Sequence, residues 1–151
     1  MTSTRRNTAV AFFDTFKTLS VQDAISIRTP TCRHIFTPAS ISPPPPLDNA
    51  QFAAHISRLK EIIASFPVTT KEISEDQEKN QVIIWATAQA EFHTELKDAG
   101  ISDEEWAYKG EYVFILTMDE TGQKIDRVVE FLDSKATERL RELMARARAN
   151  K

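Results

Sequence analysis

Residues 106–133 read WAYKGEYVFILTMDETGQKIDRVVEFLD, and this stretch decides the fold. It contains two runs in which apolar and polar side chains alternate, 106–118 and 124–133, and this period of two is typical of half-buried strands. Between the runs lies a turn, 119–122 (DETG), with a glycine where a positive φ is needed. The stretch therefore predicts a β-hairpin with one face turned toward a core.

The segments upstream and downstream extend the sheet and supply helices to cover it. Strands are expected at 31–37, 68–74, 81–94, 106–118 and 124–133. Helices are expected at 4–19, 20–27, 48–66 and 135–149, from capping residues and from apolar side chains at spacings of three and four. Four consecutive prolines, 43–46, predict a rigid extended loop over 38–46.

The order of these elements predicts a cone. Strands joined by short turns pair antiparallel, and a strongly twisted sheet of this kind has one concave face. The amphipathic helices of the N-terminal half are the only elements available to cover that face. We therefore predict an α+β fold, a cone-shaped α+β barrel in which a curved antiparallel sheet is covered by N-terminal helices. One domain is expected to span 1–151, with a ligand cavity inside the cone.

The composition is that of a globular protein without a basic or membrane-spanning segment. The net charge is -3, and Lys and Arg are spread along the chain, which argues against a nucleic-acid partner. No apolar run reaches the roughly 20 residues that a bilayer span needs. Cys32 is the only cysteine, so no disulfide can form within the chain, as suits a reducing compartment. We expect a soluble, cytoplasmic protein with neither nucleic acid nor a membrane as its partner.

Motifs for cofactors and metals are absent from the sequence. There is no serine elbow, no glycine-rich phosphate loop and no paired metal-ligand spacing. With only three glycines, a flexible backbone cradle for a nucleotide is implausible. We therefore predict no cofactor and no metal.

Several motifs resemble a known family. They are Cys32-Arg33-His34, Pro38-Ala39-Ser40, Asp48-Asn49-Ala50-Gln51-Phe52, Gly110-Glu111-Tyr112-Val113-Phe114 and the closing segment 124–134 (KIDRVVEFLDS). With the order of elements, they resemble the SnoaL-like branch of the nuclear transport factor 2-like superfamily. More narrowly, the chain is similar to small fungal isomerases that act on meroterpenoids or on polyketide-derived tetrahydroxanthones. The resemblance implies cofactor-free acid–base chemistry on a hydrophobic small molecule, in a homodimer built on the exposed sheet face.

Four side chains are candidates for this chemistry: His34, His55, Glu130 and Arg33. An isomerase without a cofactor needs a base, an acid and a group that holds the developing enolate. His34 or His55 could be the base, and Glu130 could return the proton with a pKa raised by apolar surroundings. Arg33 could hold the oxyanion, although strand alternation points it away from His34. Alternatively, the histidines are structural and Glu130 forms an ion pair with an arginine.

Cys32 has two readings. Its neighbours Arg33 and His34 could activate it as a thiolate, because cations lower the pKa of a thiol. Burial habits instead favour a small apolar residue on a strand.

Aromatic side chains are expected to form the wall of the cavity. The candidates for substrate binding are Trp85, Trp106, Tyr108, Tyr112 and Phe52. Core or interface positions are the alternative for them. The family resemblance, taken with these residues, implies a cofactor-independent isomerase of a polycyclic, polyketide-derived fungal natural product, of the tetrahydroxanthone or meroterpenoid type, acting through an enolate. A dehydratase or cyclase on the same fold, or a non-catalytic binding or dimerisation module, is the alternative.

Overall fold

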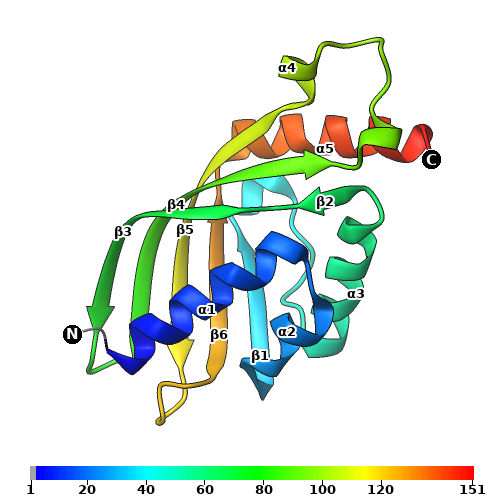
Figure 1. Cartoon of the computed structure of the whole chain (residues 1–151). Helices are drawn as coiled ribbons and strands as arrows, with labels where there is room; N and C mark the ends of the chain where they lie inside the picture. The colour runs from blue at the N-terminus through cyan, green and yellow to red at the C-terminus, as the bar shows by residue number, and fades with distance from the viewer. Residues whose placement is uncertain (1–2) are drawn as a thin grey trace.

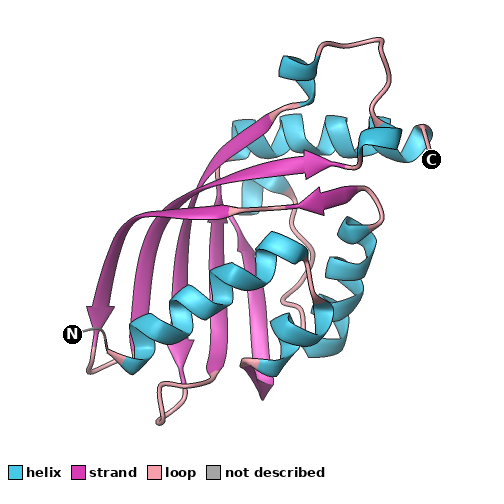
Figure 2. Cartoon of the chain, in the orientation of Figure 1, coloured by secondary structure: helices cyan, strands magenta, loops and turns pink. Residues whose placement is uncertain are grey.

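A computed structural model describes residues 3–151, and its centre is a six-stranded sheet (Figures 1 and 2). The strands are β1 (Arg28–Thr37), β2 (Ile63–Ser65), β3 (Val68–Asp76), β4 (Gln81–Phe92), β5 (Tyr108–Met118) and β6 (Ile125–Leu132). Their order is β1-β6-β5-β4-β2, and β3 also pairs with β4. The sheet curls around helices on one side, which confirms the predicted cone-like α+β fold.

One pairing differs from the predicted antiparallel sheet, because β1 runs parallel to β6. These two strands are not joined by a turn, so no short connection dictates their direction. β1 also begins at Arg28, upstream of Pro30, and its register shifts between Arg28 and Arg33. A proline is tolerated there because β1 is an edge strand.

Helices cover the concave side of the sheet. α1 (Thr4–Thr18), α2 (Val21–Ser26) and α3 (Asn49–Lys60) lie on that side, and α5 (Ser134–Ala149) crosses one end of the sheet (Figure 1). Shorter helical turns are η1 (Ala39–Ile41), η2 (Thr94–Leu96) and α4 (Asp103–Trp106). The four longer helices each begin at a side chain that accepts from a backbone N–H of the first turn: Ser3, Ser20, Asp48 and Asp133. Among residues 3–151, no helix has the length and apolar character that crossing a membrane would require.

The predicted helix 48–66 is shorter in the structure. α3 ends at Lys60, and β2 follows and pairs with the end of β4, with Ile63 opposite Phe92. Ile62 and Ile63 are completely buried. A short apolar run fits the end of a buried helix or a strand equally well, and here the free edge of β4 selects the strand.

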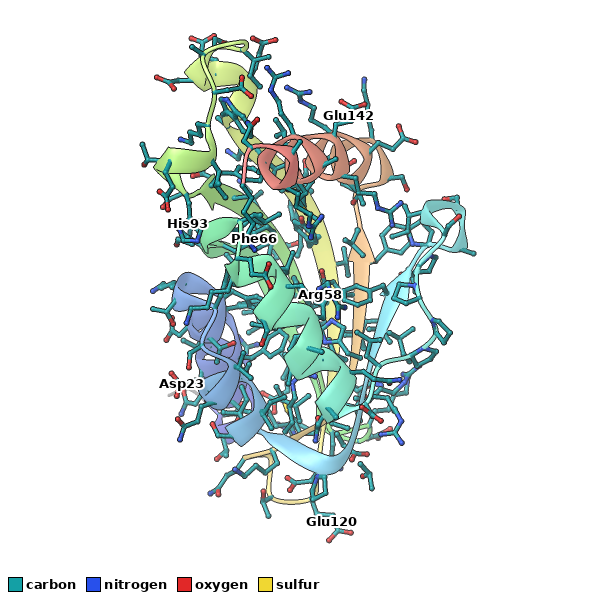
Figure 3. The ribbon with its side chains drawn as sticks, turned by 90° about the vertical axis from the view of Figure 1, so that its right-hand side faces the viewer. Asp23, Arg58, Phe66, His93, Glu120 and Glu142 are labelled. Atoms are coloured by element: carbon teal, nitrogen blue, oxygen red, sulfur yellow. The ribbon has the colours of Figure 1, made fainter. Side chains whose placement is uncertain are left out.

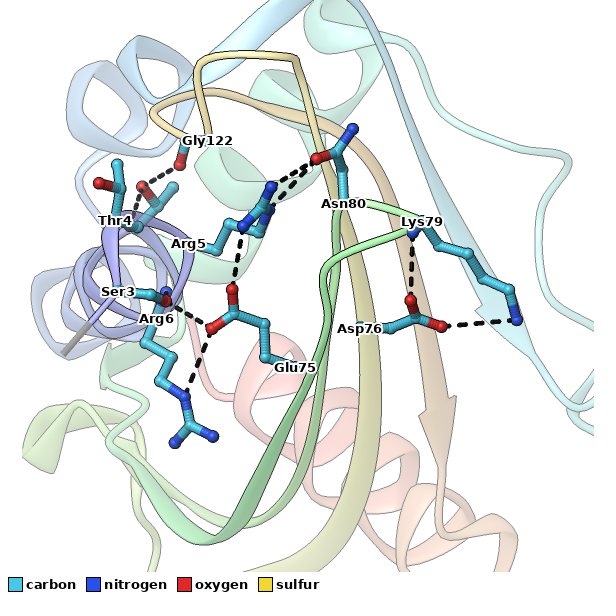
Figure 4. A network of polar contacts seen from close by, with 10 residues as sticks. Ser3, Thr4, Arg5, Arg6, Glu75, Asp76, Lys79, Asn80 and Gly122 are labelled. Atoms are coloured by element: carbon cyan, nitrogen blue, oxygen red, sulfur yellow. Dashed lines mark hydrogen bonds and ion pairs between the residues drawn. The ribbon is translucent and has the colours of Figure 1, made fainter.

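Polar contacts fasten the start of α1 to the strands beneath it (Figure 4). Glu75 of β3 accepts hydrogen bonds from Ser3 Oγ at 2.5 Å and from Arg5 Nη1 at 3.0 Å. Arg5 Nη2 also donates to Asn80 Oδ1 at 2.7 Å. Thr8 Oγ1 donates to a backbone oxygen of the β5–β6 turn at 2.6 Å. These contacts close the end of the cone that lies away from α5 (Figure 1).

Candidate active site

A cavity of about 210 Å³ lies between the concave face of the sheet and helices α1, α3 and α5. Figure 3 views the molecule from the side of α3, with α5 above it. Most of the lining is apolar: Phe16, Leu19, Phe36, Ile41, Pro43, Pro44, Phe52, Ile56, Leu59, Ile63, Phe66, Leu132, Leu140 and Met144. Five polar side chains complete it: His55, Tyr112, Glu130, Thr137 and Arg141. Within residues 3–151, no group of three or more His, Cys, Asp or Glu side chains is arranged to hold a metal ion.

Glu130 and His34 form a buried pair on neighbouring strands. Parallel pairing places Phe36 opposite Glu130 and His34 opposite Val128, so both polar side chains turn to the concave face. His34 Nε2 lies 2.9 Å from Glu130 Oε1. The side chain of His34 is completely buried, and that of Glu130 is 11% exposed. The parallel β1–β6 pairing therefore joins two of the predicted site residues.

Arg28, at the start of β1, extends this pair to a network of three. Its Nη2 lies 3.1 Å from His34 Nδ1. Its Nε donates to the Ala24 carbonyl at 3.1 Å, and its Nη1 lies 3.6 Å from Cys32 Sγ. The guanidinium sits 3.8 Å above the ring of Phe52. Arg28 is buried, and no carboxylate of residues 3–151 pairs with it directly.

The donors in this network fix the protonation of His34. A guanidinium can only donate, so Nδ1 of His34 accepts the bond from Arg28. The hydrogen of the neutral ring is then on Nε2, which donates to Glu130 Oε1. Burial, with the charge of Arg28, lowers the pKa of His34 well below its ordinary value of 6.5 and keeps the ring neutral. Both ring nitrogens are engaged, so His34 has no free lone pair with which to act as the base.

Glu130 is the group of this network that can exchange a proton with a ligand. Burial raises its pKa from 4.5 to about 7, while the positive charge of Arg28 opposes that rise. Oε1 accepts the bond from His34, and Oε2 makes no hydrogen bond to the described part of the chain. A carboxyl group whose pKa lies near the working pH is suited to both taking and returning a proton.

His55 lines the cavity from α3. Its ring centroid lies 5.4 Å from that of Phe36 and 6.0 Å from that of Phe52. Burial lowers its pKa from 6.5 to about 4, so the ring is neutral at pH 7. An imidazole with such a low pKa is a weaker base than Glu130, and its nitrogens are better suited to hydrogen bonding with a ligand.

Arg33 requires a correction, because it does not reach the cavity. It is exposed, and its Nη1 donates to the backbone oxygens of Thr31 at 3.3 Å and Cys32 at 3.0 Å. Strand alternation sends it to the side opposite His34, and the cation beside His34 is Arg28 instead. Arg28 was not predicted as a site residue, because it lies directly before a Thr-Pro pair, where a helix was predicted to end.

Of the two interpretations of Cys32, the structure supports the small, buried apolar residue. It is completely buried on β1. Burial raises the pKa of its thiol, against the opposing effect of Arg28. The thiol is therefore not the activated thiolate that neighbouring cations could have produced.

The five aromatic candidates divide between the cavity and other places. Phe52 and Tyr112 line the cavity, and Phe52 stacks on His34 with 4.5 Å between ring centroids. Tyr108 is buried beside Tyr112. Trp85 lies on the outer face of the sheet, where its Nε1 donates to Glu111, because its position in β4 alternates outward. Trp106 is a core residue packed against Phe92, and its Nε1 donates to the backbone of Asp98.

Comparisons with known proteins place the chain in a family. No protein-family model matches the chain. Over 145 residues, the chain is 32% identical to austinoid biosynthesis cluster protein J of Aspergillus calidoustus, and the match covers 89% of this chain and 78% of that protein. The crystal structure of BvnE pinacolase from Penicillium brevicompactum superposes with a TM-score of 0.81 at 22% identity, over 95% of this chain and 96% of that one. A protein described as a SnoaL-like polyketide cyclase, from Shewanella denitrificans, superposes with a TM-score of 0.70 at 13% identity, over 91% of this chain and 97% of that one. The chain therefore belongs to the family of austinoid biosynthesis cluster protein J, and it has the fold of the SnoaL-like polyketide cyclase structure.

Proposed function

We propose that the protein is a cofactor-independent isomerase of a polycyclic, polyketide-derived fungal natural product of the meroterpenoid or tetrahydroxanthone type. The observation that carries the proposal is Glu130, a carboxyl group with a pKa of about 7 on the wall of an apolar cavity. A hydrophobic ligand fits such a lining, and one group that can both take and return a proton is what an isomerisation needs.

The mechanism begins with Glu130 ionised. Oε2 removes a proton from a carbon next to a carbonyl group, the electrons of that C–H bond move onto the carbonyl oxygen, and an enolate forms. Oε1 is held meanwhile by the N–H of His34, which Arg28 keeps in the required tautomer. Glu130 then returns the proton to another carbon, or to the other face of the same carbon, and is ionised again. His34 and Arg28 act as positioning residues, and His55 is a neutral hydrogen-bonding group on the α3 side of the cavity.

The relatives support a place in secondary metabolism. The 32% identical relative is a protein of an austinoid biosynthesis cluster, and BvnE is described as a pinacolase. A pinacol-type rearrangement, like an enolisation, is promoted by acid and base groups in a ligand cavity. That name favours one alternative in particular, in which protonated Glu130 acts as the acid on a hydroxyl leaving group, as in a dehydratase or a cyclase.

Deletion of the gene in the organism that carries it provides the test. The substrate should accumulate, and purified protein added to the extract of the deletion strain should convert it. In H₂O, an isomerase gives a product with the mass of the substrate, whereas a dehydratase gives a product lighter by one water. In D₂O, the product of the isomerase gains deuterium. A binding or dimerisation module leaves the extract unchanged.

Two variants test the role of Glu130 in the same extract. Glu130→Gln should slow the conversion by about 100- to 10,000-fold, the usual effect of losing one acid–base group. Glu138→Gln, which changes an exposed carboxyl group on α5, is the matched control and should convert the extract at the wild-type rate. Equal rates for the wild type and Glu130→Gln would contradict the mechanism.

We also propose that the outer face of the sheet forms a homodimer. Apolar side chains gather there on three neighbouring strands: Ile83, Trp85, Val113 and Phe131 are 38%, 41%, 37% and 50% exposed. Trp85 lies opposite Val113, and Val113 lies opposite Phe131, so these side chains are contiguous. An apolar patch of this kind is typical of an interaction surface. We further propose that residues 1–151 form one domain and that the protein is cytoplasmic, as the sequence predicts.

A further inference from the structure

Two tyrosines meet inside the cone above a glycine. Tyr108, Gly110 and Tyr112 occupy alternate positions of β5, so all three face the concave side of the sheet. The two hydroxyl oxygens lie 2.5 Å apart. A Cβ atom at position 110 would overlap the Tyr108 hydroxyl, so only glycine leaves room for this contact. The pattern Tyr-x-Gly-x-Tyr therefore produces a pair of hydroxyl groups as well as an aromatic wall.

One hydroxyl hydrogen of this pair has no acceptor among residues 3–151. Each tyrosine hydroxyl carries one hydrogen, and one of the two hydrogens is used between Tyr108 and Tyr112. No other atom of residues 3–151 makes a hydrogen bond with either hydroxyl group. Tyr112 lines the cavity and Tyr108 does not. When Tyr108 donates to Tyr112, the hydrogen of Tyr112 is free for a ligand.

This free donor lies near Glu130. Tyr112 is paired with Leu132 and Phe114 with Glu130, so Tyr112 and Glu130 are diagonal neighbours on the inner face of adjacent strands. The Cα atoms of diagonal neighbours are roughly 7–8 Å apart, within reach of aromatic and long side chains, so both polar groups can contact one bound ligand. Burial raises the pKa of Tyr112 and the charge of Glu130 adds to this effect, so the hydroxyl keeps its hydrogen at any pH at which Glu130 titrates.

We propose that Tyr112, supported by Tyr108, donates a hydrogen bond to a carbonyl oxygen of the bound polycyclic ligand. The inference rests on the proposed function and narrows the substrate class to ketones whose carbonyl group adjoins the carbon that Glu130 deprotonates. When the C–H electrons move onto the carbonyl oxygen, the hydrogen of Tyr112 stabilises the new negative charge. Tyr112 keeps its own hydrogen throughout, and the proton travels only between the ligand and Glu130. The enolate thereby gains the donor that Arg33, on the surface, does not supply.

Fluorenone and fluorene are suitable probes, because they share three fused rings and only fluorenone has a carbonyl oxygen. Tyr112→Phe should weaken fluorenone binding by about 2- to 12-fold, the range for one neutral hydrogen bond, and leave fluorene binding within about twofold. The infrared C=O stretch of bound fluorenone should lie at a lower wavenumber in the wild type than in Tyr112→Phe. Tyr108→Phe should give an intermediate value, because Tyr112 then donates without support.

Thr87→Val is the matched control, since it removes a hydroxyl group from the outer face of β4, and it should leave both probes unaffected. An identical C=O stretch in the wild type and Tyr112→Phe overturns the inference and leaves the proposed function standing. Failure of both probes to bind the wild-type cavity overturns the two together. If Tyr112→Phe does not fold, the stretch in Tyr108→Phe decides: a shift toward higher wavenumber supports the hydroxyl pair, and no shift overturns it.

Discussion

Glu130→Gln removes one titrating group from the cavity while keeping its shape and its hydrogen bond from His34. The pKa of Glu130 is about 7 in the folded protein against an ordinary value of 4.5, so the folded state binds this proton more tightly than the unfolded chain does. The resulting contribution to the free energy of unfolding is therefore complete below about pH 4.5 and is lost as the pH rises through 7. Between about pH 5 and about pH 8, the loss amounts to about 2–3 kcal/mol, at about 1.4 kcal/mol for each pH unit between the two pKa values.

Urea unfolding of the wild type and Glu130→Gln at these two pH values measures this contribution. The free energy of unfolding of the wild type minus that of the variant should fall by about 2–3 kcal/mol from pH 5 to pH 8. His34 and His55, with their lowered pKa values, destabilise both proteins in acid, so their effect largely cancels in this difference. Glu138→Gln should track the wild type at both pH values. A difference that stays constant within about 0.5 kcal/mol would refute the reasoning that burial controls the titration of Glu130.

Three further results are expected. Arg28→Met removes a charge that lowers the pKa of Glu130. The acid limb of the pH–rate profile for the conversion should therefore move to higher pH. An unmoved limb would show that the network does not act on the carboxyl group. Gly110→Ala forces a methyl group into the space of the tyrosine hydroxyls and should lower the free energy of unfolding in urea by about 1–3 kcal/mol. An unchanged value would show that the two tyrosines move aside without strain. Trp85→Glu and Phe131→Glu place a charge in the proposed apolar interface and should each give a monomer by size-exclusion chromatography with light scattering, whereas a monomeric wild type would contradict the dimer.

The fold was predictable where local chemistry dictates it. Alternation in 106–118 and 124–133, with a short turn between them, requires an antiparallel hairpin, and β5 and β6 form one. The parallel pairing of β1 with β6 was not predictable in this way, because no turn joins these strands and no local pattern records their direction. The end of α3 was missed for a different reason. The apolar residues around Ile63 satisfy both a helix and a strand, and the unpaired edge of β4 decides between them.

The candidate site was predictable in part. The structure places Glu130 and His55 on the cavity wall and His34 directly behind Glu130, while their catalytic roles stay predictions. Arg28 was missed because it lies directly before Thr29-Pro30, where a helix was predicted to end, whereas in the structure it begins β1 and contacts His34. The Tyr108–Tyr112 contact depends on the missing side chain at position 110, which a count of aromatic residues does not register.

The position of β6 also determines when the acid–base pair can form during folding. β6 lies between β1 and β5, so β1 and its neighbouring helices have no place in the sheet until β6 has been synthesised. His34 and Glu130 are 96 residues apart, and bringing such distant segments together is a slow, entropically costly step. The N-terminal part of the chain leaves the ribosome first, when His34 still lacks the carboxyl group of Glu130. A chain cut short before β6 therefore lacks both the strand that pairs with β1 and the carboxyl group of the network.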